Sequence, residues 1–482
     1  MVDLTLVCPP AGVAPSVRLA SAQGRWLLLV TILGSSLASV DATVVNIALP
    51  AIGHDLGMGF AGLQWTLTAY TLTLASFILL GGSAGDRFGR RRVFFIGVIW
   101  FAAASLLCAL APTGGVLIAA RAVQGIGAAL VTPASLAIIQ TTYGEADRAR
   151  AVGTWAGFSG VASALGPFLG GWLLEAGSWR LVFLINLPLA ALVAWLCVKY
   201  VPETRDPEAT GPLDAPGALA GTVGLGGISY ALISAPSAGL LSAGVVLSLV
   251  LGLTGLVAFV VIERGGRDPM VPPGVFASSQ FRAVNAVTFL VYGAIGASLF
   301  LLVIELQAAS GFSPLVAGSA LLPITVIVVA FSGRSGDLSS RFGPRAQMTI
   351  GPLVLGLATL LGLRLRTDSS YVSDVLPLVV AFGCGLAIMV APLTSAALAS
   401  VPIEHAGIAS GVNNAVARAG QLLAVAAIPA AAGLTGTAYA DPDAFLVAFR
   451  AATWACAALF FTAAILAGLT VRRPAIQRNK SS

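Results

Sequence analysis

The chain has 482 residues, of which 57% are hydrophobic and only 10% are charged. A soluble globular protein carries about 25% charged residues, so this composition excludes a soluble domain and predicts a protein solvated mainly by lipid. The net charge of +6 does not indicate nucleic-acid binding, because the basic residues follow a topological pattern. The five cysteines are scattered and form no CxxC pair, so we expect neither a disulfide framework nor a metal site.

Apolar runs of about 20 residues recur along the whole chain, and each is long enough for one membrane-spanning helix. Strands of a membrane barrel would be shorter and would alternate in polarity, so an all-α integral membrane fold is predicted. About fourteen transmembrane helices are expected, over residues 26–49, 60–82, 92–112, 115–139, 150–174, 181–201, 214–233, 238–262, 283–306, 315–333, 347–363, 374–400, 407–434 and 446–470.

The basic residues predict the orientation of these spans in the membrane. With the N-terminus inside, twenty of the 26 Lys and Arg residues fall in inner segments. Outer segments hold Arg180, Arg364, Arg366 and Arg450, while Arg121 and Arg418 lie within spans. Cytoplasmic segments of membrane proteins are enriched in Lys and Arg, so both termini are predicted to be cytoplasmic. This orientation requires an even number of spans.

One sequence pattern occurs twice and suggests an internal repeat. "GGSAGDRFGRRRV" at 81–93 follows the second span, and "SGDLSSRFGPRAQ" at 335–347 follows the tenth, 254 residues later. Six spans need about 200 residues, so the surplus fits two extra helices between two six-helix halves. The predicted units are an N-terminal cytoplasmic tail (1–24), an N-terminal six-helix bundle (25–202), two linker helices (203–270), a C-terminal six-helix bundle (271–470) and a second cytoplasmic tail (471–482).

The repeated pattern is predicted to form a conformational latch at the inner membrane surface. Its glycines permit a tight turn between spans, and its aspartate and arginines supply charge. Positive-inside topology alone would explain the successive arginines, but not the glycine framing or the second copy. The expected latch residues are Gly82, Asp86, Arg87, Gly89 and Arg90 in the first copy, and Gly336, Arg341 and Gly343 in the second.

Two charged residues inside spans are candidates for proton coupling. The apolar run at 27–50 carries Asp41, and "LIAARAVQGIGAAL" at 117–130 carries Arg121. A charge at such a depth costs about 2.5–3.5 kcal/mol, so each residue should face a cavity or a partner. We expect Arg121 to hold Asp41 ionised when it is close and to allow protonation when it moves away. The alternative for Asp41 is a structural hydrogen bond to a neighbouring helix, and the alternative for Arg121 is a structural arginine that snorkels or bonds a carbonyl.

Of the twenty acidic residues, Asp41 and Glu305 alone are expected inside spans. Glu305 comes near the outer end of its span, so it is an interfacial carboxylate, a group that attracts cationic substrate or a second proton-coupling site. Aromatic and polar side chains of other spans are candidates for the wall of a substrate cavity, with ordinary packing as the alternative. These candidates are Trp65, Tyr70, Gln124, Asn413, Asn414 and Arg418.

The fifth span, "TWAGFSGVASALGPFLGGW" at 154–172, is rich in glycine and contains a proline. Small residues four apart allow close helix packing, and proline breaks the hydrogen-bond ladder. This pattern favours a flexible helix at the interface between the halves, and ordinary glycine-mediated packing is equally compatible with it. The residues concerned are Gly157, Gly166, Pro167, Gly170 and Gly171.

These motifs together resemble those of drug exporters of the major facilitator superfamily. The stretches "VDATVVNIALP", "SWRLVFLINLP", "SGFSPLVAGSALLP" and "GIASGVNNAVARAG" are similar to its fourteen-span drug:proton antiporter branch. The resemblance covers residues 26–470, and Gly166-Pro167 matches the motif associated with antiporters. It implies the major facilitator fold, with the latch aspartate capping a helix of the opposite half in the outward-open state. Ala84 replaces the usual leucine, and Ser340 replaces the second aspartate, which implies an asymmetric latch.

The resemblance implies secondary active efflux by alternating access across the bacterial plasma membrane, in exchange for protons. The implied substrates are small amphipathic or cationic drugs or toxic metabolites. Export of a specific endogenous metabolite, self-made antibiotic or lipid is the alternative. An enzyme and an ATP-driven pump are not expected, because HExxH and GxxxxGK[ST] do not occur. The expected partners are a small-molecule substrate, protons and the bilayer, with no cofactor, ATP or nucleic acid, and the chain is expected to be monomeric.

Overall fold

The structure is a computed structural model, and it describes residues 17–471 except 208, 210, 267–269, 272, 402–405, 435, 437, 438 and 440. The first half contains α1 (Ala22–Asp55), α2 (Phe60–Phe88), α3 (Arg90–Ala109), α4 (Gly114–Thr142), α5 (Glu145–Glu175), α6 (Leu181–Leu184) and α7 (Asn186–Tyr200). Two further helices follow, α8 (Ala215–Ala238) and α9 (Ala243–Gly265). The second half contains η1 (Pro273–Ala277), α10 (Ser279–Ala308), α11 (Pro314–Ala320), α12 (Leu322–Phe342), α13 (Arg345–Leu360), η2 (Leu361–Arg364), η3 (Tyr371–Val375), α14 (Leu376–Leu398), α15 (Ala406–Ala431) and α17 (Pro442–Thr470).

Every predicted span corresponds to a helix or a broken pair of helices. Within the described residues, thirteen helical segments are long and apolar enough to cross a membrane. The segment that is not among them, α15, has 26 residues, which correspond to about 39 Å of helix. It is less apolar because it carries Asn413, Asn414 and Arg418, yet it packs along α10 and α2. The predicted all-α membrane fold is therefore confirmed, with most helices longer than their apolar runs.

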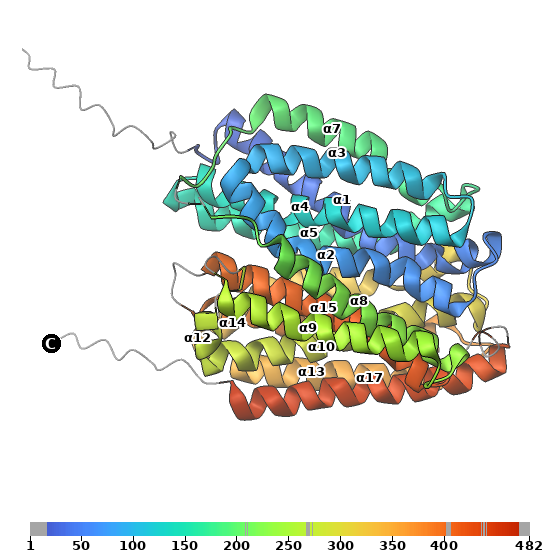
Figure 1. Cartoon of the computed structure of the whole chain (residues 1–482). Helices are drawn as coiled ribbons and strands as arrows, with labels where there is room; N and C mark the ends of the chain where they lie inside the picture. The colour runs from blue at the N-terminus through green and yellow to red at the C-terminus, as the bar shows by residue number, and fades with distance from the viewer. Residues whose placement is uncertain are drawn as a thin grey trace, which may run out of the picture.

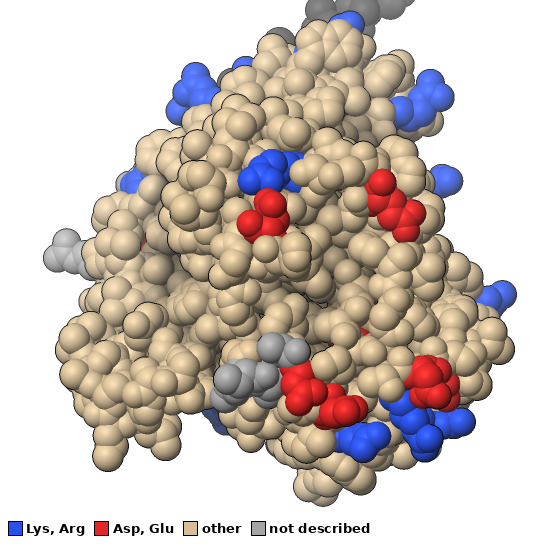
Figure 2. Space-filling model, turned by 90° about the vertical axis from the view of Figure 1, so that its right-hand side faces the viewer, with Lys and Arg blue, Asp and Glu red and all other residues tan. Residues whose placement is uncertain are grey.

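Two layers of helices lie one above the other in Figure 1, with α1 to α7 in one and α10 to α17 in the other. The helices α8 and α9 pair with each other, and α8 also packs against α2 and α15 at the junction of the layers (Figure 1). From this arrangement we propose that the chain divides at the boundaries predicted from the sequence, into an N-terminal bundle, two linker helices and a C-terminal bundle. α1 begins and α17 ends at the same end of the bundle, which we call the inner end, following the orientation predicted from the arginines. The opposite outer end, seen in Figure 2, carries sparse charges on a largely uncharged surface.

Close packing of α1 on α5 depends on the proline of α5. Pro167 has no N–H, so the carbonyl of Ser163, four residues earlier, loses its helical donor. The hydroxyl of Thr43 on α1 donates to this carbonyl at 2.8 Å. A Cβ on Gly166 would overlap Thr43, and one on Gly170 would lie 2.9 Å from the Val44 carbonyl oxygen. The glycine and proline residues of α5 therefore bring the two backbones into contact and leave one carbonyl for α1 to satisfy.

This contact predicts the effect of removing one hydroxyl. Replacing Thr43 by Val keeps the side-chain shape but leaves the Ser163 carbonyl without a donor, which costs about 1–3 kcal/mol. We expect a lower midpoint of thermal unfolding for the purified protein in detergent. Thr222 is the matched control, because its hydroxyl donates only within its own helix, to Ala218. An equal midpoint for Thr43→Val and Thr222→Val would contradict this role of the contact.

The two halves are closed against each other at the outer end. A Cβ on Gly171 of α5 would lie 2.5 Å from Leu315 of α11, and one on Gly318 of α11 would overlap the Pro167 carbonyl oxygen. Side chains also bond across the halves, with Gln307 donating to the Ile47 carbonyl at 3.0 Å. Backbone is in contact with backbone here, so no larger residue fits without separating the helices.

The inner halves of α5 and α12 are not packed in this way. A Cβ on Gly153, Gly157 or Gly160 of α5 would meet nothing within 4 Å, and the same holds for Gly333 of α12. Phe158, on the same half of α5, is 57% exposed. An outer end closed by α5 and α11, together with open inner halves of α5 and α12, describes an inward-facing arrangement.

The predicted latch loop is shorter than the sequence suggested, and this part of the prediction is wrong. α2 continues through Gly82, Asp86 and Arg87 to Phe88, so the whole turn consists of Gly89 with φ of +106°. The charged residues are helical because their run continues the α2 hydrogen-bond ladder as far as the first residue that can take positive φ. In the second copy, Gly343 has φ of +81° and ends α12 in the same way.

The side chains of the first latch copy contact their own half. Asp86 accepts from Nε and Nη2 of Arg90 at 2.9 and 2.6 Å. The backbone N–H of Arg90 donates to Thr204, and that of Arg91 donates to Glu203, both in the segment after α7. Arg87 lies over the Phe88 ring at 5.8 Å. In the second copy a Cβ on Gly336 would lie 3.9 Å from Ala391, and the Arg341 side chain falls outside the described residues.

Candidate proton-coupling and substrate site

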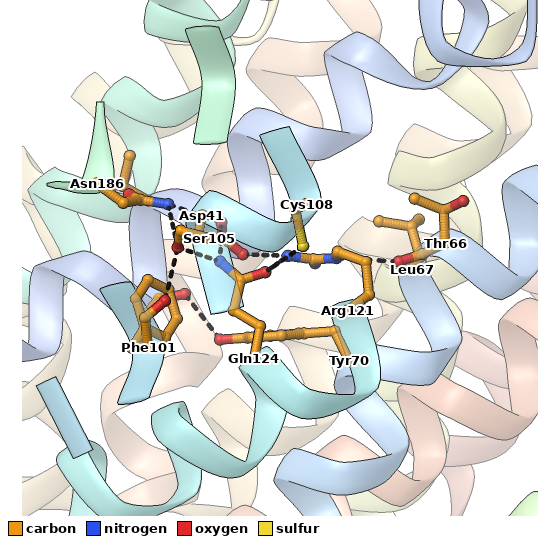
Figure 3. A network of polar contacts seen from close by, with 12 residues as sticks. Asp41, Thr66, Leu67, Tyr70, Phe101, Ser105, Cys108, Arg121, Gln124 and Asn186 are labelled. Atoms are coloured by element: carbon orange, nitrogen blue, oxygen red, sulfur yellow. Dashed lines mark hydrogen bonds and ion pairs between the residues drawn. The ribbon is translucent and has the colours of Figure 1, made fainter. Parts of the chain in front are cut away.

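Four other helices of the first half place polar side chains around Asp41, which lies halfway along α1 (Figure 3). Arg121 and Gln124 come from α4, and Ser105 comes from α3. Asn186 is the first residue of α7, immediately after the break that separates this helix from α6. α2 contributes Tyr70 and a backbone carbonyl. Each of these side chains is at least 97% buried, so the network is closed off from solvent.

The Asp41 carboxyl accepts hydrogen bonds at both oxygens. Nη1 of Arg121 donates to Oδ2 at 2.5 Å. Nε2 of Gln124 and Nδ2 of Asn186 donate to Oδ1 at 2.8 and 3.0 Å. Because every partner is a donor, this arrangement fits a carboxylate rather than a carboxylic acid. The Ser105 hydroxyl accepts from Gln124 at 2.8 Å and donates to the Phe101 carbonyl, which holds the amide in place.

The guanidinium of Arg121 is held by other groups as well as by the carboxylate. Its Nε donates to the Thr66 carbonyl at 3.1 Å, and its Nη1 also reaches Oε1 of Gln124 at 2.5 Å. The Tyr70 ring lies 4.4 Å from the guanidinium carbon, and the Phe183 ring lies 5.7 Å from it. Aromatic faces attract a desolvated cation, so these rings stabilise the guanidinium inside the bundle. The Nη2 atom of Arg121 has no partner among the described residues, so the N–H groups of this nitrogen remain available for another ligand.

The burial of this ion pair makes the two charges interdependent. Asp41 and Arg121 form a salt bridge in which neither side chain is exposed. Removing one partner of a buried pair leaves an uncompensated charge and costs about 3–5 kcal/mol. A proton on Asp41 would have a related effect, because it would cancel the negative charge that balances Arg121. A role of this pair in proton coupling therefore stays a prediction.

Sequence reasoning placed Asp41, Arg121, Gln124 and Tyr70 in candidate sites, and the structure brings all four together. It missed Asn186 and Ser105, which complete the shell around Asp41. Asn186 had a usable signal, since it is an amide inside the apolar stretch "SWRLVFLINLP". Ser105 had none, because single serines are common in membrane spans and bond within their own helix.

The position of Asn186 predicts a measurable effect. Asn186→Leu keeps the side-chain volume. It removes the hydrogen bonds that Asn186 donates to Oδ1 of Asp41 and to the hydroxyl oxygen of Ser105. A lost hydrogen bond to a buried charged group costs about 1.5–3 kcal/mol, so we expect a lower unfolding midpoint and weaker export. Asn414→Leu is the matched control for stability, because this exposed amide donates only to the Ser410 carbonyl of its own helix. Equal unfolding midpoints in the two variants would remove Asn186 from the network.

A narrow space of about 20 Å³ lies between the halves beside the network. Arg121 and Tyr70 line it from the first half, and Arg418 and Gln421 line it from α15. Asn46 also faces this space, and its buried Oδ1 atom has no partner. Sequence analysis missed Asn46, although it is the only amide in the first span. The structure thus brings Arg418 to the same space as Tyr70 and Arg121.

The other predicted cavity residues lie elsewhere. Asn413 donates to Asn285 at 3.1 Å and to Thr288 at 2.9 Å, which ties α15 to α10. Trp65 packs against Tyr230 of α8, with ring centroids 6.2 Å apart. Among the described contacts, these side chains join helices, and they do not line the central space.

Glu305 is fully buried in α10. Its Oε1 accepts from the Ser310 hydroxyl at 2.8 Å, while Oε2 has no partner. This environment fits a buried ionisable group better than an exposed interfacial carboxylate, and its role in proton coupling stays a prediction. Glu263, near the end of α9, is buried as well, with an exposed fraction of only 5%, although the sequence led us to expect only Asp41 and Glu305 inside spans.

Comparison with known proteins supports the fold and the class. The model of the Major Facilitator Superfamily matches residues 31–425. The chain is 40% identical to the puromycin resistance protein pur8 of Streptomyces alboniger, over 89% of this chain and 87% of that protein. It is 36% identical to the multidrug resistance protein Stp of Mycobacterium tuberculosis, over 83% and 74%. It is 34% identical to a methylenomycin A resistance protein of Bacillus subtilis, over 91% and 94%.

Solved structures share the fold at low sequence identity. The peptide transporter POT in complex with sulfate superimposes with a TM-score of 0.67 at 15% identity, covering 94% of this chain and 96% of that one. A bacterial homologue of the lysosomal transporter Spinster gives a TM-score of 0.64 at 19% identity, over 94% and 98%. The chain belongs to the Major Facilitator Superfamily and is a multi-pass membrane transporter whose relatives include antibiotic and multidrug resistance proteins.

Proposed function

We propose that this chain exports small, amphipathic or cationic drugs or toxic metabolites from a bacterial cell in exchange for protons. The transporter works in the plasma membrane as a monomer, with both termini in the cytoplasm. The observation that carries the proposal is the fully buried ion pair of Asp41 and Arg121, whose Asp41 partners are all donors. A charge pair of this kind at the middle of a membrane bundle marks a proton or substrate pathway more often than a structural contact.

The inward-facing arrangement suggests the order of events. In this state Arg121 and two amides stabilise the carboxylate, so a proton carried by Asp41 is released toward the cytoplasm. Closure of the inner halves of α5 and α12 requires the halves to rotate about the central space. If Arg121 shifts toward this space, Asp41 loses its counter-charge, and desolvation favours the protonated form. Protons then enter with the cycle while substrate leaves.

The relatives support the direction of transport and the kind of substrate. Pur8 and the methylenomycin A protein are named for resistance to an antibiotic, and a relative in Streptomyces glaucescens is named for resistance to and export of tetracenomycin C. Resistance by a transporter requires outward movement of the toxic compound. We propose that this chain also transports a toxic compound of this kind out of the cell.

The test uses inverted membrane vesicles that contain the protein and an acid interior. Addition of a substrate should partly collapse the pH gradient, because protons leave the vesicle as substrate enters. The panel should include puromycin, methylenomycin A, tetracenomycin C and lipophilic cationic dyes. Vesicles without the protein control for passive effects of weak bases. A gradient that no member of the panel disturbs, together with no accumulation of any of them, would contradict drug:proton exchange.

A further inference from the structure

A second, larger space lies outside the ion-pair network. It has a volume of about 470 Å³ and lies between α8, α9, α2 and α15, near their inner ends. Ligand pockets for small molecules have volumes of about 300–1,000 Å³, so this chamber is of suitable size. Its wall is largely apolar and includes Leu79, Leu256, Phe259, Met270, Val412 and Val416.

The chamber also contains a buried carboxyl that is only partly satisfied. Glu263 of α9 lines the chamber and is 5% exposed. Its Oε2 accepts from the Val271 N–H at 2.9 Å, but its Oε1 has no donor. The carboxyl of Asp214, at the start of α8, lies close enough to interact with it. Asp214 Oδ1 accepts from the Gly217 N–H at 2.8 Å, and Oδ2 again has no donor.

The Glu263 and Asp214 carboxyls are close enough to hydrogen-bond to each other, which they can do only when one of them carries a proton. A carboxylate pair in an apolar setting needs a proton or a cation between or beside its oxygens, because desolvated negative charges repel. A third unsatisfied group comes from α2, where the buried hydroxyl of Ser76 lines the same chamber without a partner. Two polar atoms without a donor or acceptor among the described residues, Glu263 Oε1 and Ser76 Oγ, therefore line one largely apolar space, with the Asp214 carboxyl beside it.

The chamber contrasts in charge with the central space. Arg121 and Arg418 line the central space, whereas the chamber contains Glu263 and lies beside Asp214. Arg264 also lines the chamber, but its side chain is exposed. α2 and α15 contribute to both spaces, so these two helices form the partition between them.

We propose that this chamber is a binding site for a hydrophobic organic cation, with its apolar body against Phe259 and Val416 and its positive centre at the Glu263–Asp214 pair. The site receives compounds from the inner end before they reach the central space. This inference rests on the proposed function, because it names the substrate class and an entry site for the same transport cycle. Binding at the chamber does not itself require proton exchange.

Equilibrium binding of radiolabelled tetraphenylphosphonium to the full chain in nanodiscs tests the proposal. Wild type should bind this cation saturably. Glu263→Gln, which is nearly isosteric, should bind it about tenfold more weakly, because the variant loses one charge-assisted contact with the cation. Ala415→Trp, which fills the chamber without changing charge, should weaken binding at least as much. Asp368→Asn is the matched control, because it removes an exposed acid far from the chamber and should bind like wild type.

The contradicting results are also defined. The proposal is overturned if Glu263→Gln and Ala415→Trp, both shown to be folded by thermal unfolding, bind like wild type. It is overturned as well if tetraphenylborate, an anion of the same shape, binds at this site as tightly as the cation, or if only a bilayer lipid competes for the chamber. The Asp41→Asn variant separates the two proposals: Glu263-dependent binding in that variant supports the chamber even if pH-driven export is absent.

Discussion

Asp41→Asn should abolish export driven by a pH gradient while leaving substrate exchange across the membrane intact. Asparagine cannot carry the proton, but its amide oxygen can still accept from Arg121, so the binding geometry is largely kept. In proteoliposomes, we expect accumulation against a substrate gradient to fall to the level of empty liposomes. Exchange of labelled for unlabelled substrate, which needs no net proton movement, should continue.

The control must account for the charge that Asp41→Asn leaves unpaired. A buried Arg121 without a counter-charge destabilises the bundle by about 3–5 kcal/mol, so a simple loss of protein could be mistaken for a loss of coupling. The double variant Asp41→Asn/Arg121→Gln removes both charges and should restore the unfolding midpoint without restoring pH-driven accumulation. Uphill accumulation at the wild-type rate in either variant would show that Asp41 is not the proton carrier.

Gly318→Leu should block closure of the outer end and reduce export by roughly tenfold or more, with normal expression. A side chain here would overlap the Pro167 carbonyl, which is backbone and cannot change rotamer. Overpacking of a tight contact costs about 1–3 kcal/mol, and about 1.4 kcal/mol corresponds to a factor of ten in the population of a state. The effect falls on the inward-facing arrangement, because α5 and α11 meet at the outer end in this arrangement.

Gly244→Leu is the matched control for this prediction. Gly244 is exposed near the outer end of α9, and a Cβ there would meet nothing within 4 Å. It adds the same side chain at a similar depth without touching the interface between the halves. Rates of labelled substrate export, normalised to the amount of protein, compare the two variants. Similar export by Gly318→Leu and Gly244→Leu would mean that the contact of α11 with α5 is not needed for the cycle.

Most of the fold could be predicted from the sequence because one physical effect dominates it. Backbone groups in lipid must bond internally, so each apolar run of about 20 residues becomes a helix. The ends of the helices were harder to predict. The sequence predicted that the second span ends at Gly82, but α2 continues for six more residues. Charged residues at the membrane surface can continue a helix, and Gly89 then allows the chain to turn. Hydropathy reports burial in lipid, and helix ends are set by hydrogen bonds and backbone conformation.

The centre of the site could also be predicted, but its outer members could not. A carboxylate in an apolar span is costly, so Asp41 and Arg121 stood out by physical cost alone. Asn186 and Asn46 cost less, and their importance depends on which helices meet at Asp41 and at the central space. The burial of Glu263 was not expected because its place at the end of α9 suggested exposure, whereas the N–H of Val271 donates to its carboxyl.

The coupling of protons to substrate through Asp41 is tested most directly in proteoliposomes with no imposed pH gradient and a pH-sensitive dye inside. Substrate is allowed to run down its own concentration gradient, and the internal pH is followed. In wild type, protons should move opposite to the substrate, whereas Asp41→Asn should carry substrate without a pH change. Downhill substrate flow without proton movement in wild type, or equal proton movement in Asp41→Asn, would contradict the account.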